Sequence, residues 1–268
     1  MFCDHNFMIR TDVATRDNHL EMKDNFSAQA SKYAQYRPQY PQALIDYIGT
    51  LVRKQDTALD LATGNGQIAV KLSTIFQTVH ATDISDSQLK NAVKADNIFY
   101  RNERAEQTSF EDNSFDLITV GQAVHWFDFS IFYKEVYRIL KPDGVFAILG
   151  YGLPTTNPRA DRVIQHFYKN IVGPYWDAER KFIEENYETI PFPFKEIETL
   201  PWQNDFEWSA SQILGYLESW SATQHYKKRT GINPVDLIRG ELSLVWETGD
   251  KKVRFPLLLR IGRPYPKF

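Results

Sequence analysis

The residues best placed to do chemistry in this sequence lie at 57–67, where an apolar run passes into a glycine turn. Gly64 and Gly66 allow backbone angles and a close ligand approach that larger side chains prevent. Asp60 ends this apolar run, and Asp83 ends the next one. A strand, a glycine turn and a helix amino terminus expose N–H groups that bind polar or anionic ligands. The stretch therefore predicts a binding loop for a small polar molecule.

Two interpretations of this loop are open. Residues 64–69, G-N-G-Q-I-A, fit the dinucleotide-binding pattern G-x-G-x-x-A, with Asp83 near the expected distance. In dinucleotide-binding folds the first glycine follows the strand directly, whereas here residues 60–63 intervene. Read as D-x-A-x-G-x-G, residues 60–66 resemble motif I of the class I S-adenosylmethionine-dependent methyltransferases. Ala62 then stands where that family usually has its first glycine.

Three further segments resemble the same family. Residues 33–41, Y-A-Q-Y-R-P-Q-Y-P, resemble the amino-terminal signature of the trans-aconitate methyltransferase type. Residues 104–110 resemble the loop that flanks the adenine, with Arg104 where an acid is common. Residues 121–128, G-Q-A-V-H-W-F-D, resemble the segment after the fourth strand, including its His-Trp pair. The resemblance covers about residues 25–150, and it implies a class I fold, S-adenosylmethionine as cofactor and methyl transfer as activity.

Several side chains have two possible roles. Asp83 can accept hydrogen bonds from both ribose hydroxyls or can cap the next helix. His125 can take a proton from a hydroxyl or amine acceptor, a step that a carboxylate acceptor does not need, or it can simply pack beside Trp126. Arg37 can bind a carboxylate of the acceptor or of the cofactor. The tyrosines of residues 33–40 can fold over a ligand or pack the leading helix on the sheet.

The residues expected to bind cofactor are Asp60, Ala62, Gly64, Gly66, Asp83, Ile84, Ala105, Glu106 and Gln122. The residues expected to bind substrate are Tyr33, Arg37, Trp126, Tyr175 and Trp176, with His125 as the catalytic candidate. All six tryptophans lie at Trp126 or beyond. We expect some of them to line a pocket and others to fill the core, because large aromatic side chains supply much of the buried area.

These residues need a scaffold that brings loops to one edge of a sheet. Five short apolar strands alternate with helical patterns between residues 57 and 150, which predicts a parallel sheet covered on both faces. Later strand-like runs at 196–207 and 253–261 are expected to pair antiparallel at the sheet edge. The sequence thus predicts an α/β fold with a doubly wound, mostly parallel seven-stranded sheet and a helical cap. The cap helices are expected at 159–172, 178–187, 209–219 and 234–247.

Three segments are expected along the chain. They are a flexible leader at 1–24, a cofactor-binding Rossmann-like domain at 25–150, and a cap with the last two strands at 151–268.

Composition restricts the partners. The net charge of −3 and a pI near 6.1 give no general attraction to nucleic acid, and the one basic triplet, residues 227–229, is expected at a helix end or loop. One cysteine and six scattered histidines predict neither a disulfide nor a metal site. No apolar run is long enough to span a membrane. We expect a cytoplasmic monomer or homodimer that acts on a small molecule.

Three functions remain in competition. The leading one is an S-adenosylmethionine-dependent methyltransferase acting on a small molecule, with O-methylation of a carboxylic acid as the specific expectation. The first alternative is an NAD-dependent oxidoreductase that uses the same glycine loop. The second is a catalytically silent ligand-binding protein with the same fold.

Overall fold

The strands predicted between residues 57 and 150 form the centre of the protein in its computed structural model, which describes residues 36–266. The strands are β1 (Thr57–Leu61), β2 (Thr78–Asp83), β3 (Ile98–Asn102), β4 (Phe115–Gly121), β5 (Leu140–Tyr151), β6 (Lys195–Ile197), β7 (Trp202–Glu207) and β8 (Lys252–Arg263). The first five are parallel, in the order β3-β2-β1-β4-β5. Strand β8 pairs antiparallel with β5, and β6 and β7 pair antiparallel with β8. The α/β class and the mostly parallel sheet are therefore confirmed.

The sheet of the described chain has eight strands, so the expected count of seven was wrong. The run at 196–207 is divided into β6 and β7, which pair with different parts of the long strand β8. Pro201 immediately precedes β7, and a proline has no N–H to continue a ladder. Residues 141–144, of sequence K-P-D-G, are part of β5. Because Phe115 pairs with Leu140 and Leu117 with Val145, these four residues bulge out of the ladder.

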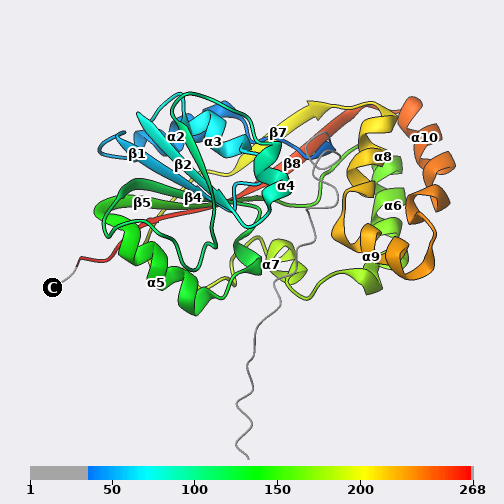
Figure 1. The fold of residues 1–268 in the computed structure, drawn as a ribbon. Helices are drawn as coiled ribbons and strands as arrows, with labels where there is room; N and C mark the ends of the chain where they lie inside the picture. The colour runs from blue at the N-terminus through cyan, green and yellow to red at the C-terminus, as the bar shows by residue number, and fades with distance from the viewer. Residues whose placement is uncertain (1–35, 267–268) are drawn as a thin grey trace, which may run out of the picture.

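Helices cover both faces of the sheet, as Figure 1 shows. They are α2 (Gln42–Thr50), α3 (Gln67–Leu72), α4 (Asp86–Lys90) and α5 (Phe129–Ile139). Alternate strand residues point to opposite faces, so Ala58 packs in a cluster with α2 and α3, whereas Leu59 packs in another cluster with α5. This arrangement leaves the carboxyl ends of the parallel strands accessible to ligands.

A helical cap stands beside the sheet and is connected to it by β7 and β8 (Figure 1). Its helices are α6 (Pro158–His166), α8 (Ala210–Glu218), α9 (Ser221–Thr230) and α10 (Arg239–Glu247). The short helix α7 (Arg180–Glu184) lies apart from them, below the sheet in Figure 1, and its Ile183 packs in the cluster that includes α5. The helix expected at 159–172 ends earlier and continues as a π-helix, Phe167–Ile171, and the one expected at 234–247 begins with a short 3₁₀ turn, Pro234–Leu237. Helix α9 was not predicted, because it is largely polar and buries little besides Ala222 and Thr223.

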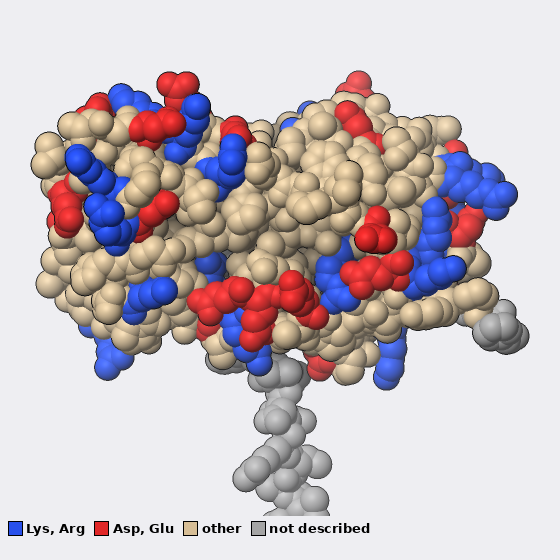
Figure 2. Space-filling view, turned by 180° about the vertical axis from the view of Figure 1, so that it is seen from behind, with Lys and Arg blue, Asp and Glu red and all other residues tan. Residues whose placement is uncertain are grey.

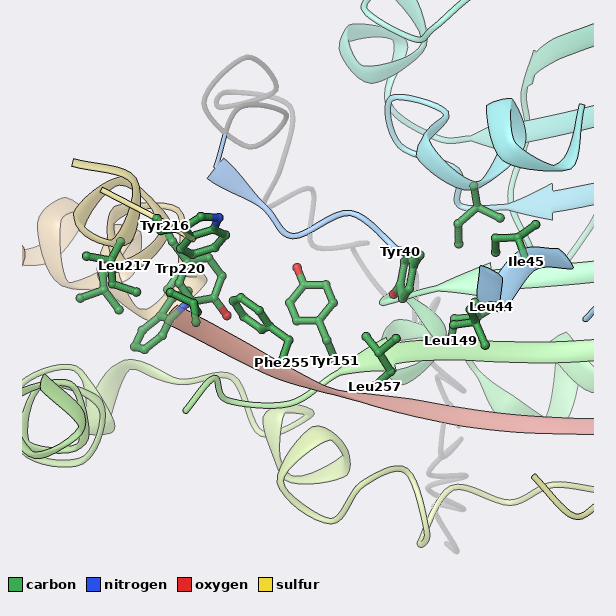
Figure 3. Packing of buried hydrophobic residues seen from close by; sticks show 14 of the residues in the cluster. Tyr40, Leu44, Ile45, Leu149, Tyr151, Tyr216, Leu217, Trp220, Phe255 and Leu257 are labelled. Atoms are coloured by element: carbon green, nitrogen blue, oxygen red, sulfur yellow. The ribbon is translucent and has the colours of Figure 1, made fainter. Parts of the chain in front are cut away.

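One hydrophobic cluster joins the sheet to the cap. Tyr151 at the end of β5 contacts Tyr40 on one side and Phe255 of β8 on the other, with ring centroids 6.2 and 5.7 Å apart. Phe255 in turn contacts Tyr216 of α8, which contacts the fully buried Trp220. Figure 3 shows how these side chains follow one another in space from Leu44 of α2 to the cap. The cap is thereby held at the sheet edge where the glycine loop lies.

Candidate active site

The glycine loop between β1 and α3 is built from left-handed backbone. Ala62, Gly64 and Gly66 have φ angles of 51°, 57° and 81°. The N–H of Thr63 donates to the carbonyl of Thr82 in β2 at 2.9 Å, which fixes the loop to the next strand. A left-handed conformation costs an alanine roughly 1 to 2 kcal/mol, so Ala62 is a strained substitute for glycine. The loop therefore holds a defined shape at some energetic cost.

Asp60 lies beneath this loop and is almost completely buried, with 1% of its surface exposed. Thr63 Oγ1 donates to one carboxylate oxygen at 2.5 Å, and Thr119 Oγ1 donates to the other at 2.9 Å. Burial raises the pKa of Asp60 to about 7, although these hydrogen bonds favour the charged form. The side chain thus ties the loop to β4 and can exchange a proton near neutral pH.

Asp83 closes the other side of the loop. Its two carboxylate oxygens accept from the N–H of Gly64 and from the N–H of Ser85, each at 2.8 Å. The helix-capping role considered for Asp83 belongs instead to Ser85, whose hydroxyl accepts from the N–H of Gln88 at the start of α4. Asp83 consequently fixes the glycine loop from the end of β2. Ile84, the next residue, is 38% exposed there.

A cavity, here named the loop cavity, opens at the carboxyl ends of β1 and β4. Its lining includes Arg37, Asp60, Ala62, Gly64 and Gln122. A side chain added at Gly64 would have no neighbouring atom nearer than 4.0 Å, so the glycine leaves space that a ligand can occupy. Of the other expected cofactor residues, Gly66 precedes α3, whereas Ala105 is buried in the core. Glu106 pairs with Arg104 at 3.8 Å.

Gln122 forms the wall between the loop cavity and a second cavity. Its φ angle is 54°, and its side chain bonds both backbone groups of Tyr151: the amide oxygen accepts from the N–H at 2.8 Å, and the amide nitrogen donates to the carbonyl at 3.3 Å. These two bonds continue the pairing of β4 with β5 beyond Gly121. The position of Gln122 is therefore set by the end of the sheet.

The second cavity, the cap cavity, lies between the sheet and the cap. It shares Arg37 and Gln122 with the loop cavity, and His125, Trp126, Trp176 and Arg180 complete much of its lining. The guanidinium of Arg37 donates to the carbonyl of Ser219 at 2.7 Å and to the hydroxyl of Tyr151 at 3.2 Å. Arg37 thus lies where the two cavities adjoin.

His125 is buried in the short helix Val124–Trp126, with 5% of its surface exposed. Its Nδ1 lies 3.1 Å from the hydroxyl of Tyr187. Burial is the main cause that lowers the pKa of His125 to about 3, and the nearby charge of Arg180 lowers it further. The imidazole is consequently neutral at physiological pH and is a weak base, which disfavours proton abstraction by this residue.

The expected substrate residues divide by position. Trp126 and Trp176 line the cap cavity, whereas Tyr175 packs on Tyr226 at 4.9 Å, outside the lining. Tyr33 lies outside the described residues, as do the leader at 1–24 and the part of the tyrosine segment before Tyr36.

Sequence reasoning missed several residues at the cap cavity, among them Arg180 and Trp220 of its lining and Tyr187, which contacts His125. Arg180 begins α7, whereas Trp220 lies between α8 and α9, and no local sequence pattern predicts that they meet. A signal did exist for Tyr187. Gly150 on β5 leaves the space that the Tyr187 ring fills, since a side chain there would lie 2.5 Å from that ring.

Among residues 36–266, no group of three or more acidic, histidine or cysteine side chains is arranged to hold a metal ion. None of the helices in this part of the chain has the length and apolar character needed to cross a membrane. Residues 227–229 occupy the last turn of α9, so the helix-end prediction is confirmed. On the face shown in Figure 2, acidic and basic side chains are interspersed rather than gathered into a basic surface.

The strand order, the antiparallel strand beside β5 and the glycine loop with acids at the ends of β1 and β2 together define the Rossmann-like fold of class I methyltransferases. Residues 59–148 match the model of the methyltransferase domain family. The comparisons support neither of the two alternative functions.

Relatives extend the match over most of the chain. A Dictyostelium discoideum protein named "Putative methyltransferase" is 33% identical over 249 residues, covering 90% of this chain and 95% of that protein. A solved structure from Anaeromyxobacter dehalogenans, a "Putative Type II Methyltransferase", is 35% identical with a TM-score of 0.78, covering 86% of this chain and all of the other. The Rickettsia prowazekii ubiquinone/menaquinone biosynthesis C-methyltransferase is 28% identical, and the match covers 69% of this chain and 76% of that protein. The chain therefore belongs to the S-adenosylmethionine-dependent methyltransferases.

Proposed function

We propose that the loop cavity binds S-adenosylmethionine and that a small carboxylic acid in the cap cavity is methylated on oxygen. The observation that carries this proposal is the common wall of the two cavities, which consists of Arg37 and Gln122. A donor in the loop cavity and an acceptor in the cap cavity would meet where the two cavities adjoin at these residues. Holding the reacting atoms in contact there would supply much of the rate acceleration.

The residues that line the loop cavity, and Asp83 beside the glycine loop, suit this cofactor. Bound S-adenosylmethionine supplies an electrophilic methyl group on a sulfonium. Asp83 presents a carboxylate at the end of β2 that can accept from ribose hydroxyls, in addition to the N–H groups that it already accepts from. Gly64 leaves the backbone open to close approach. Asp60, beneath the loop, places a group that can be negatively charged near a positively charged ligand.

The cap cavity favours an acceptor that needs no base. His125 lines this cavity, and its pKa of about 3 keeps the ring neutral and weakly basic. A carboxylate is already ionised at neutral pH, whereas a hydroxyl, amine or carbon acceptor must lose a proton. The likeness of residues 33–41 to the trans-aconitate type supports the same choice. The likeness to a C-methyltransferase supports a carbon acceptor instead, but such an acceptor would require a stronger base than His125.

Arg37 is the proposed anchor of the acceptor carboxylate. Its guanidinium is positioned by Ser219 and Tyr151 at the junction of the cavities, and a planar guanidinium binds carboxylates well. The carboxylate of the cofactor is the other group that Arg37 can bind from this position.

The test has two parts. Calorimetric titration should show binding of S-adenosylmethionine and none of NAD. Methyl transfer should then be measured with labelled cofactor against acids, phenols and amines, for the wild type and for Arg37→Ala and Arg37→Lys. If Arg37→Ala loses methyl transfer to acids alone, and Arg37→Lys recovers part of it, the result supports Arg37 as the anchor of the acceptor carboxylate. An equal loss for all acceptors assigns Arg37 to the cofactor, and absence of transfer to any acid refutes the acceptor class.

A further inference from the structure

Arg180 at the start of α7 brings a positive charge into the cap cavity. The residue is partly buried and lines that cavity but not the loop cavity. Within residues 36–266 its guanidinium forms no salt bridge. Removing a charge from water is costly unless an opposite charge or hydrogen bonds compensate for it. An unpaired guanidinium in a cavity is therefore suited to an anionic ligand.

The orientation of this guanidinium is fixed by its neighbours. Its Cζ lies 4.5 Å from the centre of the Trp176 ring, and its Nε donates to the hydroxyl of Tyr168 at 2.9 Å. Tyr168 in turn donates to Glu184, one helical turn after Arg180. The Nε side is thus engaged by the protein, while the two terminal nitrogens make no hydrogen bond within the described chain. Those nitrogens provide the paired donors that a carboxylate accepts.

The positive charge of Arg180 acts on another residue that lines the cap cavity. It contributes to the lowered pKa of His125, which lines the same space. Asp177, the acidic residue of the lining, lies with its Oδ2 3.8 Å from Nδ1 of His225. Arg180 therefore acts on the cavity as a cation whose charge no salt bridge within residues 36–266 offsets.

Three tryptophans supply flat aromatic surfaces to the lining. Trp176 and Trp220 lie with ring centroids 5.5 Å apart at 48°, and Trp126 is the third tryptophan of the cavity. Aromatic faces bind planar unsaturated groups better than they bind flexible alkyl chains, because offset stacking adds to the buried area. The lining thus combines the terminal nitrogens of Arg180, which can donate to a carboxylate, with tryptophan rings that can pack against a planar group.

We propose that Arg180 determines acceptor specificity by binding an anionic group whose attached body is planar and unsaturated, held among the tryptophans of the cap cavity. This inference rests on the proposed function for the role of the cap cavity as the acceptor site. It goes further by adding Arg180 of α7 as a second cation of the acceptor site, beside Arg37 at the junction of the cavities.

Binding, rather than turnover, tests the inference directly. The full chain is titrated by calorimetry with cinnamate, its neutral analogue cinnamamide and the flexible acid hexanoate, each with and without S-adenosylhomocysteine. The variants are Arg180→Gln, Arg180→Lys and the matched control Arg159→Gln, whose arginine is exposed at the start of α6. We expect the wild type and the control to bind cinnamate about tenfold more tightly than cinnamamide, as for one strong charged contact.

Arg180→Gln should lower this ratio by about threefold or more while leaving cinnamamide affinity unchanged, because only the contribution of Arg37 remains, and Arg180→Lys should keep an intermediate ratio. The melting temperature and S-adenosylhomocysteine binding of each variant show whether it is folded. A tenfold ratio retained in folded Arg180→Gln overturns the inference, as does a wild type that binds no cinnamate or binds hexanoate equally well. If S-adenosylhomocysteine fails to bind but the preference for cinnamate over cinnamamide still depends on Arg180, the proposed function is refuted and the anion site is supported.

Discussion

Replacing Asp60 with asparagine should stabilise the fold increasingly as the pH rises. Burial raises the pKa of this carboxyl from 3.8 to about 7, so the folded protein holds a proton that the unfolded chain releases. The free energy of unfolding of the wild type therefore falls as the pH rises from 3.8 to 7. One pKa unit corresponds to about 1.4 kcal/mol, so this cost reaches about 4 kcal/mol above pH 7. Asparagine resembles the protonated acid and carries no such cost.

The measurement is urea unfolding of the wild type and Asp60→Asn between pH 5 and pH 8, followed by tryptophan fluorescence. Over this interval the variant should gain about 3 kcal/mol relative to the wild type, and the gain should level off above pH 7. A difference in the free energy of unfolding that is the same at every pH reports the altered bonds to Thr63 and Thr119. It does not change how the two free energies diverge with pH. Asp96→Asn, at an exposed position, is the matched control and should show no such trend. Parallel curves for wild type and Asp60→Asn would refute the proposed protonation of Asp60.

Three further predictions concern the site itself. Asp83→Ala should lose most affinity for S-adenosylmethionine in calorimetry, at roughly 1.5 to 3 kcal/mol for each hydrogen bond lost, and unchanged affinity would reject ribose binding. Gly64→Val should weaken cofactor binding far more than Gly64→Ala, because the larger side chain extends into the loop cavity; normal binding by both would exclude this loop as the cofactor site. His125→Gln should retain methylation of acids with an unchanged pH profile between 6 and 8, since His125 is neutral throughout this range. If the wild-type rate rises with pH and the rate of the variant does not, His125 acts as a base.

The loop cavity could be predicted from the sequence because its parts are local. The glycine loop of residues 62–66 follows one strand, and Asp83 ends the next. Parallel strands bring their carboxyl ends to the same edge of a sheet, so residues at those ends must meet. What the sequence did not reveal was the conformation: the left-handed backbone of Ala62 and the bond from Gly64 to Asp83 depend on how β1 and β2 are joined.

The cap cavity could not be predicted in this way. Trp176 and Arg180 are near in sequence, but Trp220 and His125 come from other segments, and only the packing of the cap on β5 and β8 brings them together. Periodicity also failed for α9, whose exposed polar surface gives no apolar stripe. A glycine at its end, Gly231 with φ of 75°, was the available signal for that helix.

The end of β5 connects the two cavities physically. Gln122 is held by the backbone of Tyr151, and Arg37 is held in part by the hydroxyl of the same residue. Both components of the common wall thus depend on one residue, whose side chain Figure 3 shows between Tyr40 and Phe255. Because Phe255 also packs on Tyr216 of the cap, a displacement of the cap would be transmitted to this wall through packed rings. The alignment of donor and acceptor therefore depends on the core between sheet and cap as much as on the residues that contact either ligand.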